Sequence, residues 1–265
     1  MLAIFFILGL IIGSFLNVVI YRLKTAESLV FGGSKCPHCS SAIRWYDNIP
    51  LFSFLILRFR CRDCQEKISW QYPLVELGTA FIFVILGSQF FILNSPESWF
   101  ITLYYWILAS LSIVIFAYDF RYMEIPMSLV WIGSLVAFLF RIYSDYLAGA
   151  GWRNIFETGT FLALLSAGLA FLFFFALSYG SKEKWMGMGD AYLAIFLGLA
   201  LGGISLLYAL SIGFSLGALV GIALIILRKK NLGSQLPLAP FLIVGTWIML
   251  LWGEKFNNWY MSLFF

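Results

Sequence analysis

The sequence predicts an all-α polytopic membrane protein with about eight transmembrane helices and one long polar loop after the first helix. Two observations predict this class. Of the 265 residues, 62% are hydrophobic and only 11% are charged, whereas soluble domains carry about 25% charged residues. The apolar residues also form runs that approach or exceed the roughly 20 residues needed to cross a bilayer. The composition therefore excludes a soluble globular enzyme, and it excludes a disordered chain, which needs low hydrophobicity and high charge.

The apolar runs define the helices in order. The sixth run, 190–227, is too long for one crossing, because at 1.5 Å per residue it would reach about 57 Å, and glycines at 202 and 203 offer a turn that divides it. The expected spans are 2–21, 73–93, 99–118, 125–140, 155–179, 190–202, 203–227 and 237–252. The first run has no basic residue before it and no small-x-small cleavage site after it, so we interpret it as a retained span rather than a signal peptide.

Lys and Arg residues are unequally distributed between the two sides of these spans. Fourteen of the 17 lie in the segments that follow the first, third, fifth and seventh spans. The three exceptions are Arg141, Arg153 and Lys255. The positive-inside rule places the richer side in the cytoplasm and both termini outside. We therefore expect an inner-membrane protein with three parts: a first helix (1–21), a cytoplasmic loop (22–72) and a membrane core (73–265).

All four cysteines lie in the cytoplasmic loop as two CxxC pairs, Cys36 with Cys39 and Cys61 with Cys64. Two such turns can complete the tetrahedral ligand set of a structural zinc ion, and cytoplasmic thiols stay reduced. We predict structural zinc, which would help fold a loop too small for a core of its own. The alternatives are two disulfides, which would require the inverted topology, or a redox-active pair. His38 is interpreted as an exposed loop residue.

Asp119 and Asp190 lie against apolar runs, where a carboxylate is costly and is commonly functional. Asp119 ends the third span, and Asp190 follows Gly187-Met188-Gly189 at the start of the sixth. The topology derived from Lys and Arg places both aspartates at the same membrane face. Two neighbouring carboxyl groups tend to share one proton, and such a pair can activate water and polarise a carbonyl. The alternative for either residue is a cap of a span end in the headgroup region.

The surroundings of the two aspartates suggest further roles. Gly187 and Gly189 would allow a close backbone approach and an unusual turn beside the acid. Asp190 at a helix N-terminus would favour the charged, base-like form, and Asp119 at a helix C-terminus the protonated, acid-like form. Glu76, about one turn into the second span, is interpreted as structural, for example by pairing with a basic loop residue. Nucleic acid is not an expected partner of a chain with eight spans.

Longer motifs resemble those of the bacterial prepilin peptidases, the type IV leader peptidases. The resemblance rests on Gly13-Ser-Phe-Leu-Asn-Val-Val-Ile-Tyr-Arg22, the two CxxC pairs around Asp47-Asn-Ile-Pro-Leu51, Tyr72-Pro-Leu-Val-Glu-Leu77, Asp119 with Glu124-Ile-Pro126, Gly187-Met-Gly-Asp190 and Leu236-Pro-Leu-Ala-Pro-Phe241. These segments follow the family order over nearly the whole chain. The last one departs slightly, because Leu238-Ala239 occupies positions where a glycine is expected.

The resemblance implies a GxGD-type intramembrane aspartic peptidase with catalytic Asp119 and Asp190 and with zinc bound by the four cysteines. Such enzymes cleave the basic leader of type 4 prepilins and pseudopilins after a glycine at the cytoplasmic face. Many then N-methylate the new N-terminus with S-adenosylmethionine, an activity associated with the cytoplasmic insertion. Since the insertion is kept here, we expect both activities. The alternatives are a peptidase without methyl transfer, a proton-coupled transporter and a non-catalytic zinc-loop scaffold. The sequence indicates no residues that bind S-adenosylmethionine.

Overall fold

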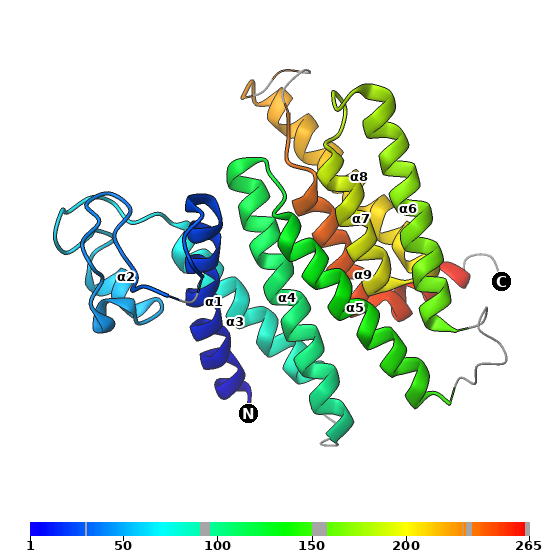
Figure 1. Cartoon of the computed structure of the whole chain (residues 1–265), viewed down its shortest axis with the longest axis horizontal. Helices are drawn as coiled ribbons and strands as arrows, with labels where there is room; N and C mark the ends of the chain where they lie inside the picture. Colours follow the sequence, from blue (N-terminus) through cyan, green and yellow to red (C-terminus); the bar gives the residue numbers. More distant parts are fainter. Residues whose placement is uncertain (30, 91–95, 150–157, 230, 232–234, 263–265) are drawn as a thin grey trace. The chain divides into compact units, whose positions relative to one another are not determined.

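The computed structural model describes the chain apart from residues 30, 91–95, 150–157, 230, 232–234 and 263–265. Regular structure in the described part is helical, with two isolated β-bridges, which confirms the predicted fold class. The helices are α1 (Leu2–Thr25), η1 (Trp45–Asn48), α2 (Phe52–Ile56), α3 (Gln71–Phe90), α4 (Pro96–Tyr122), α5 (Met127–Leu147), α6 (Gly159–Ser181), α7 (Met188–Leu201), α8 (Gly203–Ile226) and α9 (Ala239–Met261) (Figure 1). The predicted span ends Leu93 and Ile155, and Arg153 of the charge distribution, lie outside the described residues.

The apolar helices follow the predicted order, but they differ in length. Six of those described are long and apolar enough to cross a membrane, namely α1, α3, α4, α5, α6 and α8. Helix α7 has 14 residues and so reaches only about 21 Å, short of the roughly 30 Å of a hydrocarbon core. It ends at the predicted break, where Gly202 and Gly203 have φ of +69° and +53°, a conformation that favours glycine. The eight expected spans therefore correspond to eight helices, of which α7 has only 14 residues and α9 has a described apolar part limited to Ala239–Gly253.

The chain divides into two compact units, Met1–Ala117 and Tyr118–Phe265. In the first unit, α1 packs against α3, and small residues allow the two backbones to approach closely. A Cβ added at Gly9 would lie 2.5 Å from the Cα of Ala80, and one added at Gly13 would lie 2.7 Å from the Cα of Glu76. The α1–α3 pair carries the four-cysteine loop between its two helices, so this close packing fixes the base of the loop.

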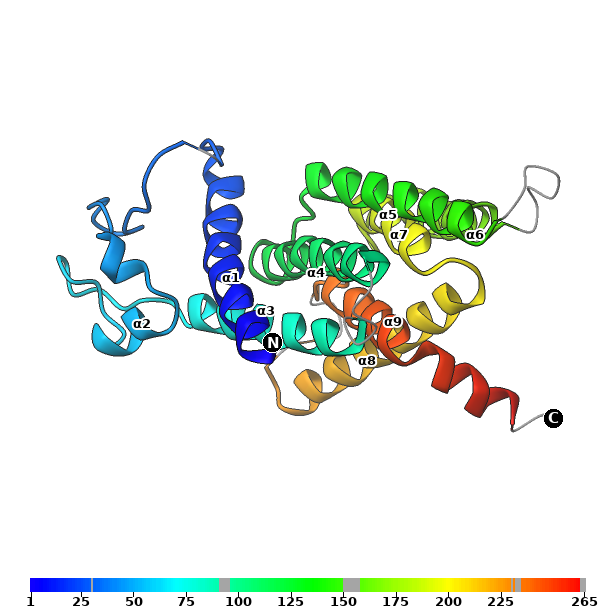
Figure 2. The same cartoon turned by 90° about the horizontal axis from the view of Figure 1, so that it is seen from below.

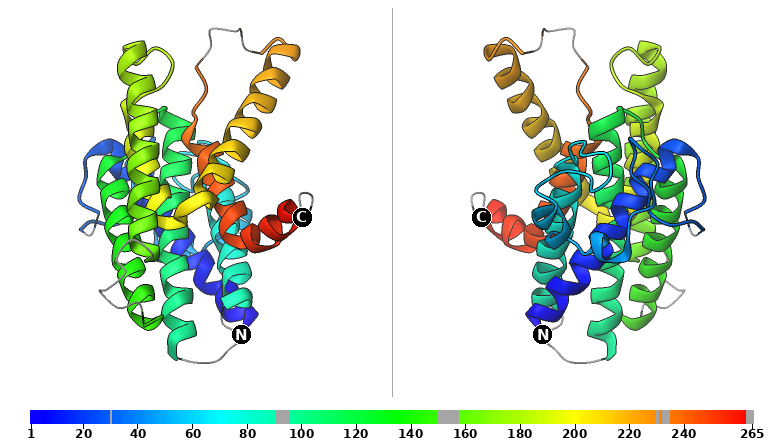
Figure 3. Two further views of the ribbon diagram at one scale, coloured as in Figure 1. Left: turned by 90° about the vertical axis from the view of Figure 1, so that its right-hand side faces the viewer. Right: turned by 90° about the vertical axis from the view of Figure 1, so that its left-hand side faces the viewer.

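In the second unit, α5, α6 and α7 pack side by side, and α8 packs against α9 (Figures 2 and 3). Glycines again mark the tightest contacts. A Cβ at Gly198 would lie 2.5 Å from the Cα of Ala167, and one at Gly245 would overlap the carbonyl oxygen of Ala209. In an apolar medium, where hydrophobic burial contributes little, such close packing of small residues is a main source of helix association.

The far end of α7 is held by a charged residue of α5. The Arg141 guanidinium donates hydrogen bonds to the carbonyl oxygens of Leu199 (3.1 Å) and Ala200 (2.6 Å), which belong to the carbonyls that a helix end leaves without an intrahelical partner. The sequence placed Arg141 in a connecting segment, whereas it lies inside α5. Asp145, one turn further along α5, accepts hydrogen bonds from the N–H groups of Gly159 and Thr160 at the start of α6. The two residues therefore fix the register of α6 and α7.

Candidate active site and metal-binding site

Asp119 lies in the last turn of α4, in the second unit, and its side chain is 5% exposed. Its carboxylate accepts a hydrogen bond from the backbone N–H of Ala239, the first residue of α9. Its Oδ2 atom is buried and has no hydrogen-bond partner among the described residues. Buried polar atoms are rarely left unpaired, so this oxygen is free to bind a water molecule or a substrate group.

Asp190 lies at the third position of α7, whose N-cap is Gly187. Its carboxylate accepts a hydrogen bond from the backbone N–H of Gly187, which is half of the capping-box arrangement. The carboxyl groups of Asp119 and Asp190 are close enough to interact electrostatically. The structure thus brings together the two aspartates that the sequence assigned to one membrane face.

Ala239 is a part of this arrangement that the sequence did not indicate as a site residue. Its N–H places the N-terminus of α9 at Asp119, so both carboxylates face the electropositive N-terminal end of a helix. The expected assignment of Asp190 as the base and Asp119 as the acid is therefore weaker, because it considered only the C-terminal end of α4 beside Asp119. A helix start within Leu236–Phe241, with Pro240 at the second position, is the sequence signal that could have indicated this contact.

The two glycines of the Gly187–Asp190 turn have different roles. A Cβ at Gly189 would lie 3.2 Å from the Cβ of Ile125, so Gly189 allows α7 to begin against the segment that follows α4. Gly187 has an ordinary extended conformation, φ −73° and ψ 152°. The predicted close approach is therefore found at Gly189, and the predicted unusual turn is not found at Gly187.

We expect Gly189→Ala to lower peptidase activity by roughly tenfold or more, because the added methyl group must displace Ile125 or shift Asp190 away from Asp119. A misplacement of about 1 Å can cost on the order of a hundredfold in rate. Gly180→Ala in α6 is the matched control, since a Cβ there meets nothing within 4 Å. Rates of substrate cleavage, normalised to the amount of protein in the membrane, measure the difference. Equal rates for the two variants would show that the contact with Ile125 does not position the aspartate.

The second candidate site is the group of four cysteines. The Sγ atoms of Cys36, Cys39, Cys61 and Cys64 lie within 4.8 Å of one another, and the thiols are free. Cys36 Sγ and Cys64 Sγ are 3.9 Å apart, close to the roughly 3.8 Å that follows from a tetrahedral ion with Zn–S bonds of about 2.3 Å. The four side chains can therefore hold a metal ion. His38 is exposed, as expected.

Two similar turns build this site. In each, the N–H of the residue after the second cysteine bonds the carbonyl of the first: Ser40 to Cys36 (2.9 Å) and Gln65 to Cys61 (3.1 Å). Ser40 and Gln65 have φ of +59° and +60°. Hydrogen bonds from Ser41 lower the pKa of the Cys39 thiol to about 6, whereas burial raises the pKa of the Cys36 thiol. Despite a backbone hydrogen bond from Glu66, burial and the neighbouring thiols raise the pKa of the Cys64 thiol to about 12.

An ion pair links the second cysteine turn to η1. Arg62 donates from Nε (2.8 Å) and Nη2 (2.6 Å) to the two carboxylate oxygens of Asp47, a bidentate geometry. This hydrogen bonding holds the pKa of Asp47 below its usual value. The contact ties Cys61–Cys64 to the Asp47–Leu51 segment, so the two halves of the loop support each other.

Glu76 anchors the loop to the α1–α3 pair. Its Oε2 accepts a hydrogen bond from the backbone N–H of Leu51 (2.9 Å), and its carboxylate also bonds the Ser14 side chain of α1. Glu76 therefore has the structural contacts that its expected role requires, but they are to a backbone N–H and a hydroxyl group rather than to a basic loop residue. Asn17 adds a further link, donating to the carbonyl of Tyr72 (3.0 Å).

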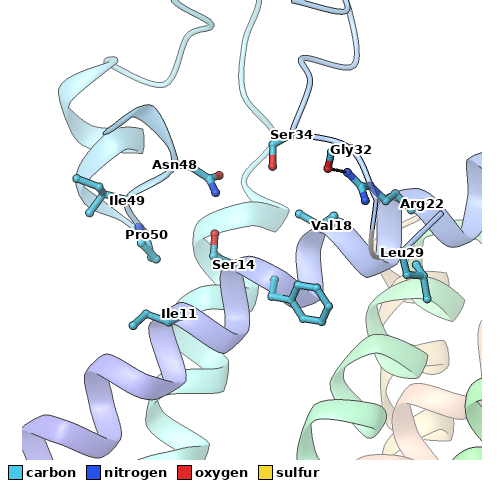
Figure 4. Close-up of a pocket in the computed structure, with 11 residues that line it drawn as sticks. Ile11, Ser14, Val18, Arg22, Leu29, Gly32, Ser34, Asn48, Ile49 and Pro50 are labelled. Atoms are coloured by element: carbon cyan, nitrogen blue, oxygen red, sulfur yellow. Dashed lines mark hydrogen bonds between the residues drawn. The ribbon is translucent and has the colours of Figure 1, made fainter. Parts of the chain in front are cut away.

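A pocket of about 480 Å³ lies between α1 and the loop (Figure 4). Its lining includes Ile11, Ser14, Phe15 and Val18 from α1, and Ser34, Asn48, Ile49 and Pro50 from the loop. Arg22 closes one end, because its buried guanidinium donates to the carbonyl oxygens of Ser28, Phe31, Gly32 and Gly33. The pocket thus has an apolar wall on α1 and polar groups contributed by both sides.

Two family models match the chain. Residues 7–90 match the bacterial Peptidase A24 N-terminal domain, and residues 106–222 match the type IV leader peptidase family. The prepilin leader peptidase/N-methyltransferase of Aeromonas hydrophila is 32% identical over 98% of this chain and 93% of its own length. The chain belongs to the type IV leader peptidase family. No solved structure matches it.

Two other relatives with the same printed name match most of this chain at a similar identity. The Pseudomonas aeruginosa prepilin leader peptidase/N-methyltransferase is 31% identical over 97% of this chain and 92% of its own length. The Myxococcus xanthus protein of the same name is 36% identical over 83% of this chain and 62% of its own length. The peptidase match contains Asp119 and Asp190, and the N-terminal match contains the four cysteines, so the two candidate sites lie in different family domains.

Proposed function

We propose that this leader peptidase hydrolyses the bond after the leader glycine of type 4 prepilins or pseudopilins, with Asp119 and Asp190 as its catalytic pair. The observation that carries the proposal is that two carboxyl groups at helix ends of one unit lie within electrostatic range of each other, in the segment that matches the peptidase family. The relatives named above support the choice of substrate. The excess of Lys and Arg on one side favours the cytoplasmic face of the inner membrane for this site, with both termini outside.

The chemistry needs one proton shared by the two carboxyl groups. The ionised carboxylate takes a proton from water as the water oxygen bonds to the carbonyl carbon, and the protonated carboxyl group gives its proton to the carbonyl oxygen. The resulting gem-diol collapses as the amide nitrogen receives a proton and the C–N bond breaks, and the second hydroxyl proton returns to the pair. The unbonded Oδ2 of Asp119 is the atom we propose for holding the water molecule.

The geometry of the substrate suits this position. A prepilin has a basic leader followed by a hydrophobic helix, so it would lie with the helix in the bilayer and the leader at the headgroups. The scissile bond would then lie near the membrane surface, the level that we propose for both aspartates. Membranes that contain this protein should convert a purified prepilin to its mature length, seen as a mobility shift. If no shift occurs with correctly inserted protein, this function is wrong.

We also propose that the first unit N-methylates the new N-terminus, using S-adenosylmethionine as the methyl donor and zinc as a structural ion in the four-cysteine site. S-adenosylmethionine supplies an electrophilic methyl group to an amine nitrogen. The pocket between α1 and the loop fits a ligand of this kind: its volume is in the range of small-molecule sites. Its apolar side chains could pack against the adenine ring, and Ser14, Ser34 and Asn48 could bind polar groups.

Filling this pocket should separate the two activities. We expect Val18→Phe to lower methylation of the mature N-terminus by about ten- to a hundredfold, because overpacking a site costs roughly 1–3 kcal/mol. Cleavage should stay within about twofold. Ile7→Phe, on an exposed part of α1 outside the pocket lining, is the control. Mass spectrometry of the product measures both reactions, and normal methylation by the Val18 variant would place the donor elsewhere.

A further inference from the structure

The short helix α2 presents apolar side chains away from its own unit. Phe52, Leu55 and Ile56 are 64%, 62% and 72% exposed, whereas Ser53 and Phe54 are buried. In a loop surrounded by water, three large apolar side chains on five residues would form an exposed patch of the kind that marks a binding surface. These three side chains of α2 therefore need a partner that removes them from water.

The contacts of the preceding residues place α2 beside the span of α1, not beyond its end. Ile49 and Pro50 lie across the pocket from Ile11 and Ser14 of α1 (Figure 4). Ser14 precedes Arg22 by eight residues, which is about 12 Å along a helix. Since Arg22 is the first basic residue after the apolar part of α1, the tip of the loop lies well inside the level at which the apolar span ends.

A contact with α3 also puts the start of α2 below the end of a membrane span. Leu51, which immediately precedes α2, donates its N–H to Glu76, five residues into a helix that begins at Gln71. This is about 7.5 Å below the start of that span. The shared pocket and the hydrogen bond to Glu76 therefore both put the start of α2 below the level at which α1 ends and α3 begins.

The surroundings of α2 identify lipid as the covering partner. Ile11 and Phe15, which border the same pocket, are 55% and 52% exposed on the apolar face of α1. Because α1 is long and apolar enough to cross a membrane, this face meets acyl chains. The apolar face of α2 continues a surface that lipid already covers.

The residues after α2 return to the level of the membrane surface. Phe59 and Trp70, which follow α2, stack with ring centroids 5.6 Å apart, and both pack on the buried ring of Phe54 in α2. Trp70 immediately precedes α3. Aromatic rings of this kind gather at the headgroup level. Arg58 and Arg60 flank Phe59 and are exposed, where their positive charge complements anionic lipid headgroups.

We propose that α2 inserts into the bilayer leaflet beside α1, with Phe52, Leu55 and Ile56 among the acyl chains and Arg58 and Arg60 at the phosphates. The four-cysteine loop is then partly a membrane-inserted element and not wholly a domain in water. This inference concerns the first unit alone and does not depend on the proposed peptidase activity.

Hydroxyl-radical footprinting of the unmodified protein in nanodiscs of phosphatidylethanolamine and phosphatidylglycerol tests the insertion. The matched pair is Phe52 and Phe31, two phenylalanines of the same loop that are 64% and 80% exposed. Phe31 lies at the level of Arg22, which bonds its carbonyl oxygen. We expect Phe31 to be oxidised roughly tenfold faster than Phe52, because water-borne radicals are scarce among acyl chains. Similar oxidation rates for the two residues would overturn the proposal.

Photo-crosslinking distinguishes lipid from a protein partner. A diazirine amino acid introduced at Leu55 or Ile56 should give lipid adducts at about ten times the yield of the same probe at Asp63, an exposed residue of the second cysteine turn. Adducts enriched in the anionic lipid would support the placement of Arg58 and Arg60. Predominant adducts with a second copy of the chain or with a prepilin would show that α2 is a protein-binding surface, and would overturn the proposal.

Discussion

Asp119→Asn and Asp190→Asn are each expected to lower prepilin cleavage by at least about a thousandfold, while the protein stays in the membrane at its normal level. Each aspartate is proposed to gain and lose a proton in the reaction, and an amide cannot do so. General acid–base catalysis by one group contributes about a hundred- to ten-thousandfold. The amide oxygen can still accept the N–H of Ala239 or of Gly187, so the fold around the site should be kept.

Asp145→Asn is the matched control for these two variants. It changes an aspartate of the same unit that caps the start of α6 and lies away from the dyad. Its amide oxygen can keep one of the two capping bonds, so we expect cleavage within about threefold of the wild type. Cleavage is measured with equal amounts of each variant in the membrane. Normal cleavage by either dyad variant would show that this aspartate only caps the end of its helix.

Loss of the metal should unfold the four-cysteine loop. We expect Cys64→Ser to lower the zinc content from about one ion per chain to nearly none, and tryptic cleavage at Arg58, Arg60 and Lys67 to become at least about tenfold faster. Structural zinc contributes on the order of 10 kcal/mol to the folding of small domains, and a loop of this size has little core to replace that contribution. Methyl transfer should be lost with it, because the loop forms one wall of the proposed donor pocket.

Ser41→Ala provides the control for the cysteine variant. It removes the hydroxyl group that bonds Cys39 Sγ (3.0 Å) and leaves all four ligands in place. Because a bound metal ion deprotonates a coordinating thiol by itself, zinc content and trypsin resistance should stay close to the wild type. Metal analysis and the rate of tryptic cleavage measure both variants. If the Cys64 variant keeps a trypsin-resistant loop, or if the wild-type protein contains no zinc, the structural role of the metal is wrong.

Features governed by local composition could be predicted from the sequence. A helix in lipid must satisfy its own backbone groups, so apolar runs indicate the helices directly, and Gly202 with Gly203 indicates the break between α7 and α8. The distribution of Lys and Arg predicts one membrane face for Asp119 and Asp190, although these residues are 71 positions apart. The two CxxC spacings likewise indicated that four thiols would meet.

Features that depend on backbone partners could not be predicted. The donors to Asp119 and Glu76 are the main-chain N–H groups of Ala239 and Leu51, and no side chain marks them in the sequence. Arg141 has the composition of a loop residue, but its partners are the carbonyl groups at the end of α7. The depth of α2 follows from such contacts as well, so a polar loop in the sequence is partly a membrane element in the fold.

The most direct test of the central claim is mass spectrometry of a prepilin incubated with the purified protein in nanodiscs, with and without S-adenosylmethionine. The proposed function predicts a product that lacks the leader under both conditions and that gains the mass of one methylene group only when the methyl donor is present. Cleavage without methylation would show that the protein is a peptidase only, and that the proposed methyltransferase role of the first unit is wrong. An intact prepilin under both conditions, with folded and zinc-loaded protein, would contradict the assignment of Asp119 and Asp190 as a peptidase pair.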